Sequence, residues 1–455
     1  MTVLPASSGQ QLRPRGEAVR ISGKLFYGAT LKILLLDQAF YPDVVSVAQH
    51  AADLAAALVG GGHEVTVVAS RHAYDSPSQT FPQSEVWRGV RVFRVRSTAF
   101  GKGAHWRRAL DILSFYLFCI MRLALLPRFD VVVAMTVPPL ISFVAALYVR
   151  IKGGSLISWV MDLNPDEAVA VGALREGSLL VRGLSRVLRF SLSSSAAVVV
   201  LDRFMRDRVA AKGIPHKRIF VLPPWAHDSV VRYDEIARQG FRAANGLSGK
   251  FVVMYSGNHS PCHPLDTLLE AARQMAEEPN VVFLFVGGGS QFPRVREFAL
   301  RNSLAQVICL PYQPLEALAG SLSAADLHVI LMGDKLIGTV HPCKIYNILV
   351  TGSPYLYIGP SPSHITDLVT AASSDSAYFA NHGETDVVIS NIRRAAALGT
   401  RRCPAHEELA QKFSGTAIIP RLISVIEHSV EIASPDEGAE MAPQCAERSS
   451  QPPAV

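Results

Sequence analysis

A pattern of buried strands and helices runs through the first half of the chain and then starts again, and this repetition most constrains the fold. In the first half, apolar segments separated by helical patterns predict strands at Leu31–Gln38, His63–Ser70, Val90–Ser97, Asp130–Met135, Ser155–Asp162 and Ala196–Asp202. A helix predicted at Val47–Val59 ends at three glycines. Such strand–helix units form parallel, doubly wound sheets.

The strand–helix pattern restarts at the segment FVVMYSGN, Phe251–Asn258. Further strands are predicted at Val281–Gly289, Gln306–Tyr312, Asp326–Leu331 and Pro354–Gly359. With 455 residues, 49% of them hydrophobic, the chain can bury two cores. We therefore predict an α/β protein with two Rossmann-like, doubly wound domains that face each other across a cleft. Neither half has a G-x-G-x-x-G motif, which disfavours a nicotinamide or flavin cofactor.

The predicted domain boundaries follow from composition. We expect an N-terminal domain at residues 31–222, a linker rich in proline and polar residues at 223–250, and a C-terminal domain at 251–431. The final helix of the second domain is expected to pack back on the first domain. Residues 1–30 and 432–455 have the composition of disordered segments.

Charge and cysteine content limit the partners and the location. The net charge is +6 and the sequence pI is about 9.0, but the basic residues are scattered and form no nucleic-acid-binding motif. A phosphorylated ligand or an anionic membrane face fits this charge better than nucleic acid. The six cysteines show no CxxC spacing, and the first twenty residues lack the apolar core of a signal peptide. We expect free thiols and a cytoplasmic location, with peripheral contact on the inner face of the cell membrane as an option.

Two apolar stretches resemble membrane spans. Ile112–Met121 lies between Asp111 and Arg122 and is too short to cross a bilayer. The uncharged stretch 131–149 is interrupted by two prolines and is better explained as a strand, a loop and a buried helix. No membrane span is predicted.

The segment HPCKIYNILVTGSP, His341–Pro354, is the strongest local sign of a ligand site. A proline and Lys344 lead into a short helical pattern at Ile345, Ile348 and Leu349, which stops at Gly352, and another buried strand follows. A lysine beside the free N–H groups of a helix start suits a phosphate. An ordinary surface charge is the alternative.

Several segments together resemble a known family. They are YPDVVSVAQHAADLAAALVGGGHEVTVVAS, SWVMDLNPDEAVAVG, MYSGNHSPCHPLDTLLEAAR, FVGGGS, CLPYQP and PCKIYNILVTGSP, in that order. In this arrangement the chain resembles the retaining glycosyltransferases of family 4, and within them the bacterial amino-sugar and lipid-carrier transferases of surface polysaccharide synthesis. The resemblance covers Leu31–Glu427. It implies a GT-B fold, a donor nucleotide sugar bound by the C-terminal domain, and a metal-independent reaction that retains the anomeric configuration.

The resemblance also implies which residues bind the donor. Lys344 would face the diphosphate, and Asn347 stands where most relatives carry a glutamate that binds the ribose. Pro311 and Tyr312 would meet the nucleobase. The loop of the donor domain nearest the phosphates would be formed by Gly257, Asn258 and His259.

The sequence departs from the family pattern in three places. The usual pair of glutamates is replaced by Thr339 and Asn347, and the N-terminal Gly-Gly loop by Val45 and Ser46. The first donor loop lacks its usual arginine and lysine. A UDP-linked sugar remains the expected donor, and no further cofactor is expected.

A departing nucleoside diphosphate gains negative charge, which cations and dipoles must compensate. Lys344, His341 and the helix that begins near Leu265 can do this. His259 and His263 could add donors, although loop hydrogen bonding explains both equally simply. Asn347 can offer a ribose hydroxyl one acceptor oxygen, or can be a helix-surface residue.

Acidic residues follow the strand at Ser155–Asp162. Asp166 and Glu167 lie in a D-x-N-P-D-E pattern typical of a helix start, so a structural role is favoured for both. Asp162 is the candidate catalytic residue, which would orient the acceptor or take its proton.

A zinc site is an alternative for two groups of histidines and cysteines. His259, Cys262 and His263 lie in one predicted loop, with His341 and Cys343 in another. Their spacing matches no known zinc pattern, so no metal is predicted.

The segment 102–128 combines a strongly apolar helix with basic and aromatic residues, including Lys102, Arg107, Arg108 and Trp106. This combination suits docking on an anionic bilayer, and a helix buried on the N-terminal sheet is the alternative.

The sequence thus predicts a glycosyltransferase that moves a sugar from a nucleotide donor to a lipid-linked or saccharide acceptor in exopolysaccharide or cell-envelope glycan synthesis. Two rivals remain: a GT-B epimerase acting on a nucleotide sugar, and a catalytically silent GT-B partner protein.

Overall fold

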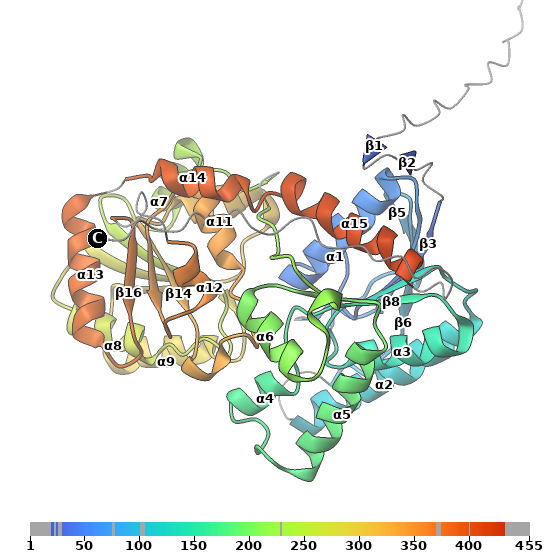
Figure 1. The fold of residues 1–455 in the computed structure, drawn as a ribbon. Helices are drawn as coiled ribbons and strands as arrows, with labels where there is room; N and C mark the ends of the chain where they lie inside the picture. Colours follow the sequence, from blue (N-terminus) through green and yellow to red (C-terminus); the bar gives the residue numbers. More distant parts are fainter. Residues whose placement is uncertain are drawn as a thin grey trace, which may run out of the picture.

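The computed structural model describes residues 20–21, 24–25, 30–74, 78–100, 105–227, 230–369, 375–399 and 401–432. These residues form two lobes, each built around a sheet with helices on both faces (Figure 1). The two segments predicted to be disordered, 1–30 and 432–455, lie outside the described residues except for positions 20–21, 24–25, 30 and 432. The basic residue Lys102 also lies outside them.

The N-terminal lobe contains an eight-stranded sheet of order β10-β9-β8-β7-β3-β4-β6-β5. All its strand pairs are parallel except β5 with β6. The strands are β3 (Lys32–Leu36), β4 (Glu64–Ser70), β5 (Ser84–Trp87), β6 (Val90–Val95), β7 (Val131–Ala134), β8 (Ser155–Trp159), β9 (Ala197–Val200) and β10 (Ile219–Val221). A separate hairpin pairs β1 (Arg20–Ile21) with β2 (Lys24–Leu25).

The C-terminal lobe contains a parallel six-stranded sheet of order β13-β12-β11-β14-β15-β16. Its strands are β11 (Phe251–Asn258), β12 (Val281–Gly288), β13 (Val307–Leu310), β14 (Leu327–Leu331), β15 (Tyr355–Ile358) and β16 (Ala377–Ala380). The inner strands of both sheets are covered on both faces, which explains why they are continuous apolar runs rather than alternating ones.

Helices of the first half pack on both faces of the N-terminal sheet. One face carries α1 (Ser46–Gly60) and α6 (Arg203–Ala211), and the other carries α2 (His105–Leu125) and α3 (Ile141–Lys152). The remaining helices of this half are α4 (Asp166–Ala170) and α5 (Leu179–Ser193).

The second sheet is covered in the same way. One of its faces packs against α8 (Asp266–Gln274), α9 (Phe292–Arg301) and α13 (Thr385–Leu398). The other packs against α7 (Glu235–Ala244), α10 (Leu318–Ser323), α11 (Lys344–Thr351) and α14 (Pro404–Gln411), and α12 (His364–Asp367) lies beside α11.

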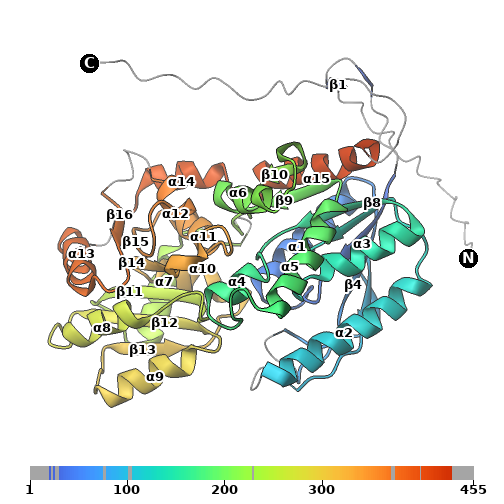
Figure 2. The same cartoon turned by 60° about the horizontal axis from the view of Figure 1, so that its bottom comes forward.

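The last helix, α15 (Gly415–Ile432), returns to the N-terminal lobe (Figures 1 and 2). Its buried side chains Ile418, Leu422 and Ile426 belong to the core formed by α1 and the N-terminal sheet. The hydroxyl of Ser155 on β8 donates to the carbonyl oxygen of Ser429 over 2.8 Å. The N-terminal core is therefore completed by the end of the chain.

All the strands named in the sequence analysis are present, and α1 begins one residue earlier than predicted. The short strands β1, β2, β5, β10 and β16 were missed, because two to four residues leave little pattern to detect. The stretch 131–149 forms a strand, a loop and a helix as predicted. Within the described residues, no helix is long and apolar enough to span a bilayer.

Candidate functional site

The two lobes meet where loops that follow the strands of one sheet contact loops of the other. After β8, the backbone N–H of Leu163 donates to the carbonyl oxygen of Thr339 over 2.8 Å. The thiol of Cys262, after β11, lies 3.3 Å from the Glu167 carboxylate. Because ligands of doubly wound folds bind at the carboxyl ends of parallel strands, this junction is the candidate site.

Lys344, the first residue of α11, carries a buried ammonium without a counter-ion. Its Nζ has no hydrogen-bond partner among the described residues and lies 3.4 Å from the centre of the Tyr255 ring. Burial lowers the pKa of Lys344 to about 7. A buried cation that contacts only an aromatic face is costly unless an anion joins it. This position therefore suits an anionic ligand, and Tyr255 was missed in the sequence analysis although it lies near the end of a predicted strand.

The ends of β11 and β12 leave space beside this ammonium. Gly257 has φ of +125°, and a Cβ atom there would lie 3.6 Å from the Nζ and Cε atoms of Lys344. Gly287 has φ of +132°, and its Cβ would lie 2.1 Å from the Gly257 carbonyl oxygen. Only glycine satisfies both positions. No side chain therefore projects from Gly257 towards this ammonium, and the role of Gly257 and the exposed Asn258 as a phosphate loop stays a prediction.

The helix boundaries predicted around this loop are confirmed. The helix α11 begins at Lys344 and ends at Gly352, which adopts the left-handed conformation with φ of +65°. The helix α8 begins at Asp266, next to Leu265.

His259 and His263 each hydrogen-bond to backbone carbonyls, which is the alternative given for both, and a phosphate contact of either ring stays a prediction. The Nδ1 atom of His259 faces the carbonyl oxygens of Gly257 and Gly288 at 3.0 and 3.2 Å, and that of His263 faces the Leu331 carbonyl at 2.8 Å. Burial and the charge of Lys344 lower the pKa of His259 to about 4 and that of His263 to about 3. Each neutral ring therefore uses its one proton on the backbone, and its other nitrogen can only accept.

His341 does not face the diphosphate loop, which corrects a prediction. Its Nδ1 lies 2.8 Å from the Asp202 carboxylate, and its Nε2 lies 2.7 Å from the Tyr346 hydroxyl. Its ring stacks on His364 with 3.8 Å between centroids. Since Asp202 follows β9 of the N-terminal lobe, His341 connects the two lobes instead of binding a ligand.

Asn347 is also engaged by the protein. Its Oδ1 accepts the backbone N–H of His227, in the stretch between the two sheets, over 3.0 Å. One lone pair of this oxygen is therefore used by the protein, and the contact with a ribose hydroxyl stays a prediction. The second departure from the glutamate pair, Thr339, is fully buried and donates to the Leu336 carbonyl.

Pro311 and Tyr312 lie after β13 at the surface, and the Tyr312 side chain is 40% exposed. A Cβ atom at Gly288 would lie 2.8 Å from the Tyr312 ring, so the ring packs over the end of β12. An exposed ring beside the anion loop is suited to a planar group, and the nucleobase contact stays a prediction.

Asp162, the predicted catalytic residue, lies after β8 at the junction of the lobes. Burial, reinforced by the charge of Glu167, raises its pKa to about 8. Glu167 accepts from the Asn164 amide and the Cys262 thiol, and Asp166 pairs with Lys212 at 2.7 Å. Asp162 is therefore the acid of this segment poised to exchange a proton near neutral pH.

The zinc alternative is wrong as a grouping. His259, His263 and His341 each bind separate protein partners, and Cys262 and Cys343 contact Glu167 and Ser46. Among the described residues, the side chains that come close enough to share an ion are Asp202, His341 and His364. Two of these were not in the predicted set.

Comparison with known proteins agrees with this arrangement. Residues 46–225 match the family model described as Glycosyl transferase 4-like domain. WcaI of Escherichia coli K12, assigned to colanic acid biosynthesis as a glycosyl transferase, is 21% identical over 412 residues, covering 84% of this chain and 95% of WcaI.

Two solved structures show the same fold at 15% identity. Sucrose-phosphate synthase from Thermosynechococcus elongatus has a TM-score of 0.68 and covers 87% of this chain and 98% of its own. HepE from Anabaena, in complex with UDP-glucose, has a TM-score of 0.64, and the match covers 87% of this chain and 99% of the HepE chain. The resemblance to family 4 glycosyltransferases and the predicted GT-B fold are confirmed.

The unpaired charge of Lys344 predicts a stability effect. Its pKa falls from 10.5 in the unfolded chain to about 7 in the fold, so the unfolded chain binds more protons between these values. The penalty is complete below pH 7 and fades as pH rises to 10.5, and it amounts to roughly 5 kcal/mol at most. We expect Lys344→Met to raise the melting temperature of the ligand-free protein by a few degrees at pH 6.5, with a smaller gain at pH 9.

The matched control is Lys335→Met, which removes an exposed lysine nearby and should change little. Thermal unfolding of the three proteins at both pH values measures the effect. A lower melting temperature for Lys344→Met at pH 6.5 would contradict the assignment of an unpaired charge.

Proposed function

We propose that this chain, a glycosyltransferase of the GT-B type, transfers a sugar from a UDP-linked donor to a lipid-linked or saccharide acceptor in exopolysaccharide or cell-envelope glycan synthesis, with retention at the anomeric carbon. The observation that carries the donor part is the buried, unpaired ammonium of Lys344 beside the open backbone of Gly257. Such a cation stabilises a diphosphate more strongly as negative charge builds up on the diphosphate. It therefore assists departure of the diphosphate from the sugar. The UDP-glucose complex of HepE and the role assigned to WcaI support the donor and the pathway class.

In the proposed reaction, the acceptor oxygen forms a bond to the anomeric carbon while the bond from that carbon to the diphosphate oxygen breaks. The electron pair of the broken bond leaves with UDP, beside Lys344. The proton of the acceptor hydroxyl passes to the Asp162 carboxylate, and Tyr312 supports the base. The anomeric configuration of the product, read by NMR, tests retention.

Calorimetric titration with UDP tests the donor site. A diphosphate beside Lys344 raises the pKa of the ammonium from about 7, so binding takes up a proton above neutral pH. We expect the affinity to be nearly constant below pH 7 and to fall by up to about tenfold per pH unit above it. Lys344→Met should bind at least about tenfold more weakly and lose this pH dependence, whereas Lys335→Met should bind as the unmodified protein does.

Binding that is flat between pH 7 and 9 and insensitive to Lys344→Met would refute the placement of the diphosphate. No binding of UDP, GDP or their sugar conjugates would instead favour a catalytically silent partner.

The raised pKa of Asp162 predicts a pH profile for turnover. At saturating donor, kcat should rise with pH and level off above about 8, because only the ionised carboxylate accepts the proton. Asp162→Asn should lower kcat by about 10²-fold or more. Glu167→Gln should stay active, but its kcat should rise at lower pH than that of the unmodified protein. The reason is that the Glu167 charge, which helps raise the pKa of Asp162, is gone. An unchanged profile in Glu167→Gln, or high activity in Asp162→Asn, would contradict this role.

The helix α2 supports a peripheral membrane contact as part of the proposal. One face packs on the sheet through Phe115, Cys119 and Leu123. The other face is also apolar and is 43–80% exposed, and it consists of Trp106, Leu110, Leu113, Leu117, Ile120, Met121 and Leu125. Arg107 and Arg108 are exposed at its start, and Figure 2 shows α2 along the outer edge of the N-terminal lobe. An apolar face flanked by arginines suits an anionic bilayer.

Co-sedimentation with phosphatidylglycerol vesicles tests this contact. We expect the unmodified protein to sediment and the double variant Leu113→Glu, Leu117→Glu to remain in solution, since two carboxylates oppose insertion. The control is Ile236→Glu, Leu300→Glu, which replaces residues 85% and 80% exposed on the other lobe and should sediment normally. Equal sedimentation of the first variant and the unmodified protein would exclude docking through α2.

A further inference from the structure

Three helices, α2, α3 and α5, lie side by side as one layer on the outside of the N-terminal lobe (Figure 2). The rings of Phe143 on α3 and Phe190 on α5 meet with 5.8 Å between their centroids. The three helices follow the parallel strands β6, β7 and β8, so each begins at the carboxyl edge of the sheet, the edge that holds Asp162. One side of this layer covers the sheet, and the other side faces away from it.

This layer carries the positive charge of the protein. The three helices contain eight arginines and lysines and one acid, Asp111, which gives a net charge of +7, whereas the whole chain has +6. The rest of the chain therefore sums to −1. The basic residues are scattered along the sequence, but the fold gathers their excess in one layer.

Helix α5 carries a stripe of three exposed arginines, Arg182, Arg186 and Arg189. Their spacing of four and three residues places them on one side of the helix over about 10 Å. Within the described residues, none of these guanidinium groups has a hydrogen bond or an ion pair. By contrast, four exposed arginines on α8, α9 and α13 are each paired with a carboxylate. A row of unpaired guanidinium groups suits a surface that presents many phosphates.

Exposed apolar side chains lie among these basic residues. Leu179 and Leu180 at the start of α5 are 83% and 59% exposed, and Ile151 at the end of α3 is 81% exposed. Of the 22 large hydrophobic side chains that are exposed in the described part of the chain, twelve lie on α2, α3 and α5. The apolar face of α2 therefore continues across α3 to α5 and does not end at one helix.

The mixture of apolar and basic groups decides between the possible anionic partners. Protein surfaces that bind nucleic acid are polar as well as basic, and a nucleic acid would leave the exposed leucines and isoleucines without an apolar partner. An anionic bilayer matches both kinds of group. Its acyl chains accept the apolar side chains, and its phosphate headgroups lie at the level of the arginines.

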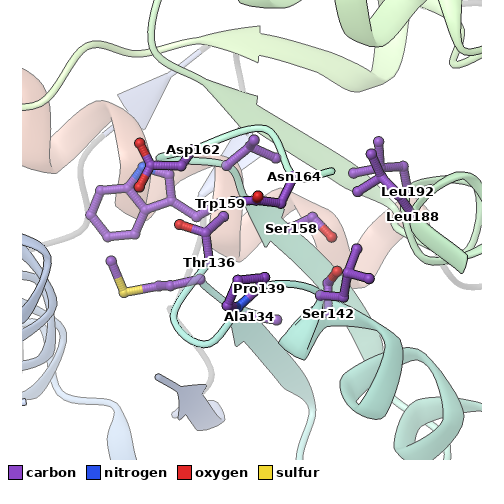
Figure 3. A pocket seen from close by; sticks show the side chains of 13 residues that line it. Ala134, Thr136, Pro139, Ser142, Ser158, Trp159, Asp162, Asn164, Leu188 and Leu192 are labelled. Carbon is purple, nitrogen blue, oxygen red and sulfur yellow. The ribbon is translucent and has the colours of Figure 1, made fainter. Parts of the chain in front are cut away.

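The inner side of α5 reaches the candidate site. Leu188 and Leu192 of α5 line the same small cavity as Asp162 (Figure 3). A helix with its side chains is about 10–12 Å across. The arginine stripe on the exposed side of α5 is therefore about one helix diameter away from the segment with the proposed catalytic residue.

We propose that the outer face of α2, α3 and α5 is one bilayer-binding surface, on which Arg182, Arg186 and Arg189 bind the phosphate groups of anionic lipids. Contact through α5 as well as α2 fixes the orientation of the lobe, so that the carboxyl edge of the sheet lies beside the membrane.

This orientation bears on the class of acceptor. An acceptor that is anchored in the bilayer can bring its sugar hydroxyl to Asp162 while its lipid tail stays in the membrane. A lipid-linked acceptor is thus favoured over a free saccharide. The acceptor class rests on the proposed function, whereas the binding of lipid phosphates by α5 does not.

Co-sedimentation with mixed vesicles of phosphatidylglycerol and phosphatidylcholine tests the role of α5 without nucleotide or turnover. The variant Arg182→Gln, Arg186→Gln, Arg189→Gln removes the stripe and leaves α2 intact. An arginine at an anionic bilayer surface strengthens binding about fivefold, so we expect this variant to bind about tenfold more weakly or worse. The difference should vanish in about 1 M salt, which screens the charges.

A second triple variant controls for the loss of charge. Arg232→Gln, Lys335→Gln, Lys412→Gln removes the same charge from three exposed positions outside the layer and should bind vesicles as the unmodified protein does. Replacing the three arginines of α5 by lysine keeps the charge and should keep most of the binding. All three variants should melt at the temperature of the unmodified protein, because the replaced side chains are exposed.

Binding of the same proteins to duplex DNA is measured in parallel. Equal weakening of vesicle binding in both glutamine variants would show that only net charge matters, and no weakening would show that α2 docks alone. Either result would overturn the proposal. Loss of DNA binding with unchanged vesicle binding would also overturn it, in favour of a nucleic acid partner. None of these results bears on the diphosphate site at Lys344, and a failure of UDP binding would leave the vesicle test valid.

Discussion

The hydrogen bond between Asp202 and His341 holds the candidate site together, because it joins the two lobes three residues before Lys344. The Asp202 carboxylate lies after β9, accepts the Met205 N–H at the start of α6, and receives His341 from the other lobe at 2.8 Å. Hydrogen bonding and charge from His341, with a contribution from His364, keep the pKa of Asp202 below its usual value despite burial. Removing a partner from a buried carboxylate of this kind strongly destabilises the folded protein. The position of α11, and with it the ammonium of Lys344, is thus set by a residue of the opposite lobe.

Around Lys344 the fold keeps other groups neutral. His259 and His263 lie close enough for the ammonium to lower their pKa, and their protons are used by backbone carbonyls. A second positive charge would repel the first in a region of low dielectric constant. In the proposed function, the remaining help for an anion would come from the backbone near Gly257, where φ is +125° and no side chain covers the chain. A single fixed charge combined with neutral dipoles favours an anionic ligand whose shape, as well as its charge, matches the site.

Strands and helix ends could be predicted, because they depend on residues that are close together in the sequence. The strands were found because parallel strands buried on both faces are unbroken apolar runs, and the start and end of α11 follow from Lys344 and Gly352. The roles of His341 and Asn347 could not be predicted, because their partners Asp202 and His227 lie 139 and 120 residues away.

The return of α15 to the first lobe determines when that lobe can finish folding. During synthesis the strands of the N-terminal sheet are made first, but the face that Ile418, Leu422 and Ile426 cover stays exposed until α15 has been made. Sequential, domain-by-domain folding on the ribosome is therefore interrupted at this face. For the same reason, a chimera that exchanges acceptor lobes between related enzymes must carry α15 with the N-terminal half, although almost two hundred residues separate it from β10 in the sequence.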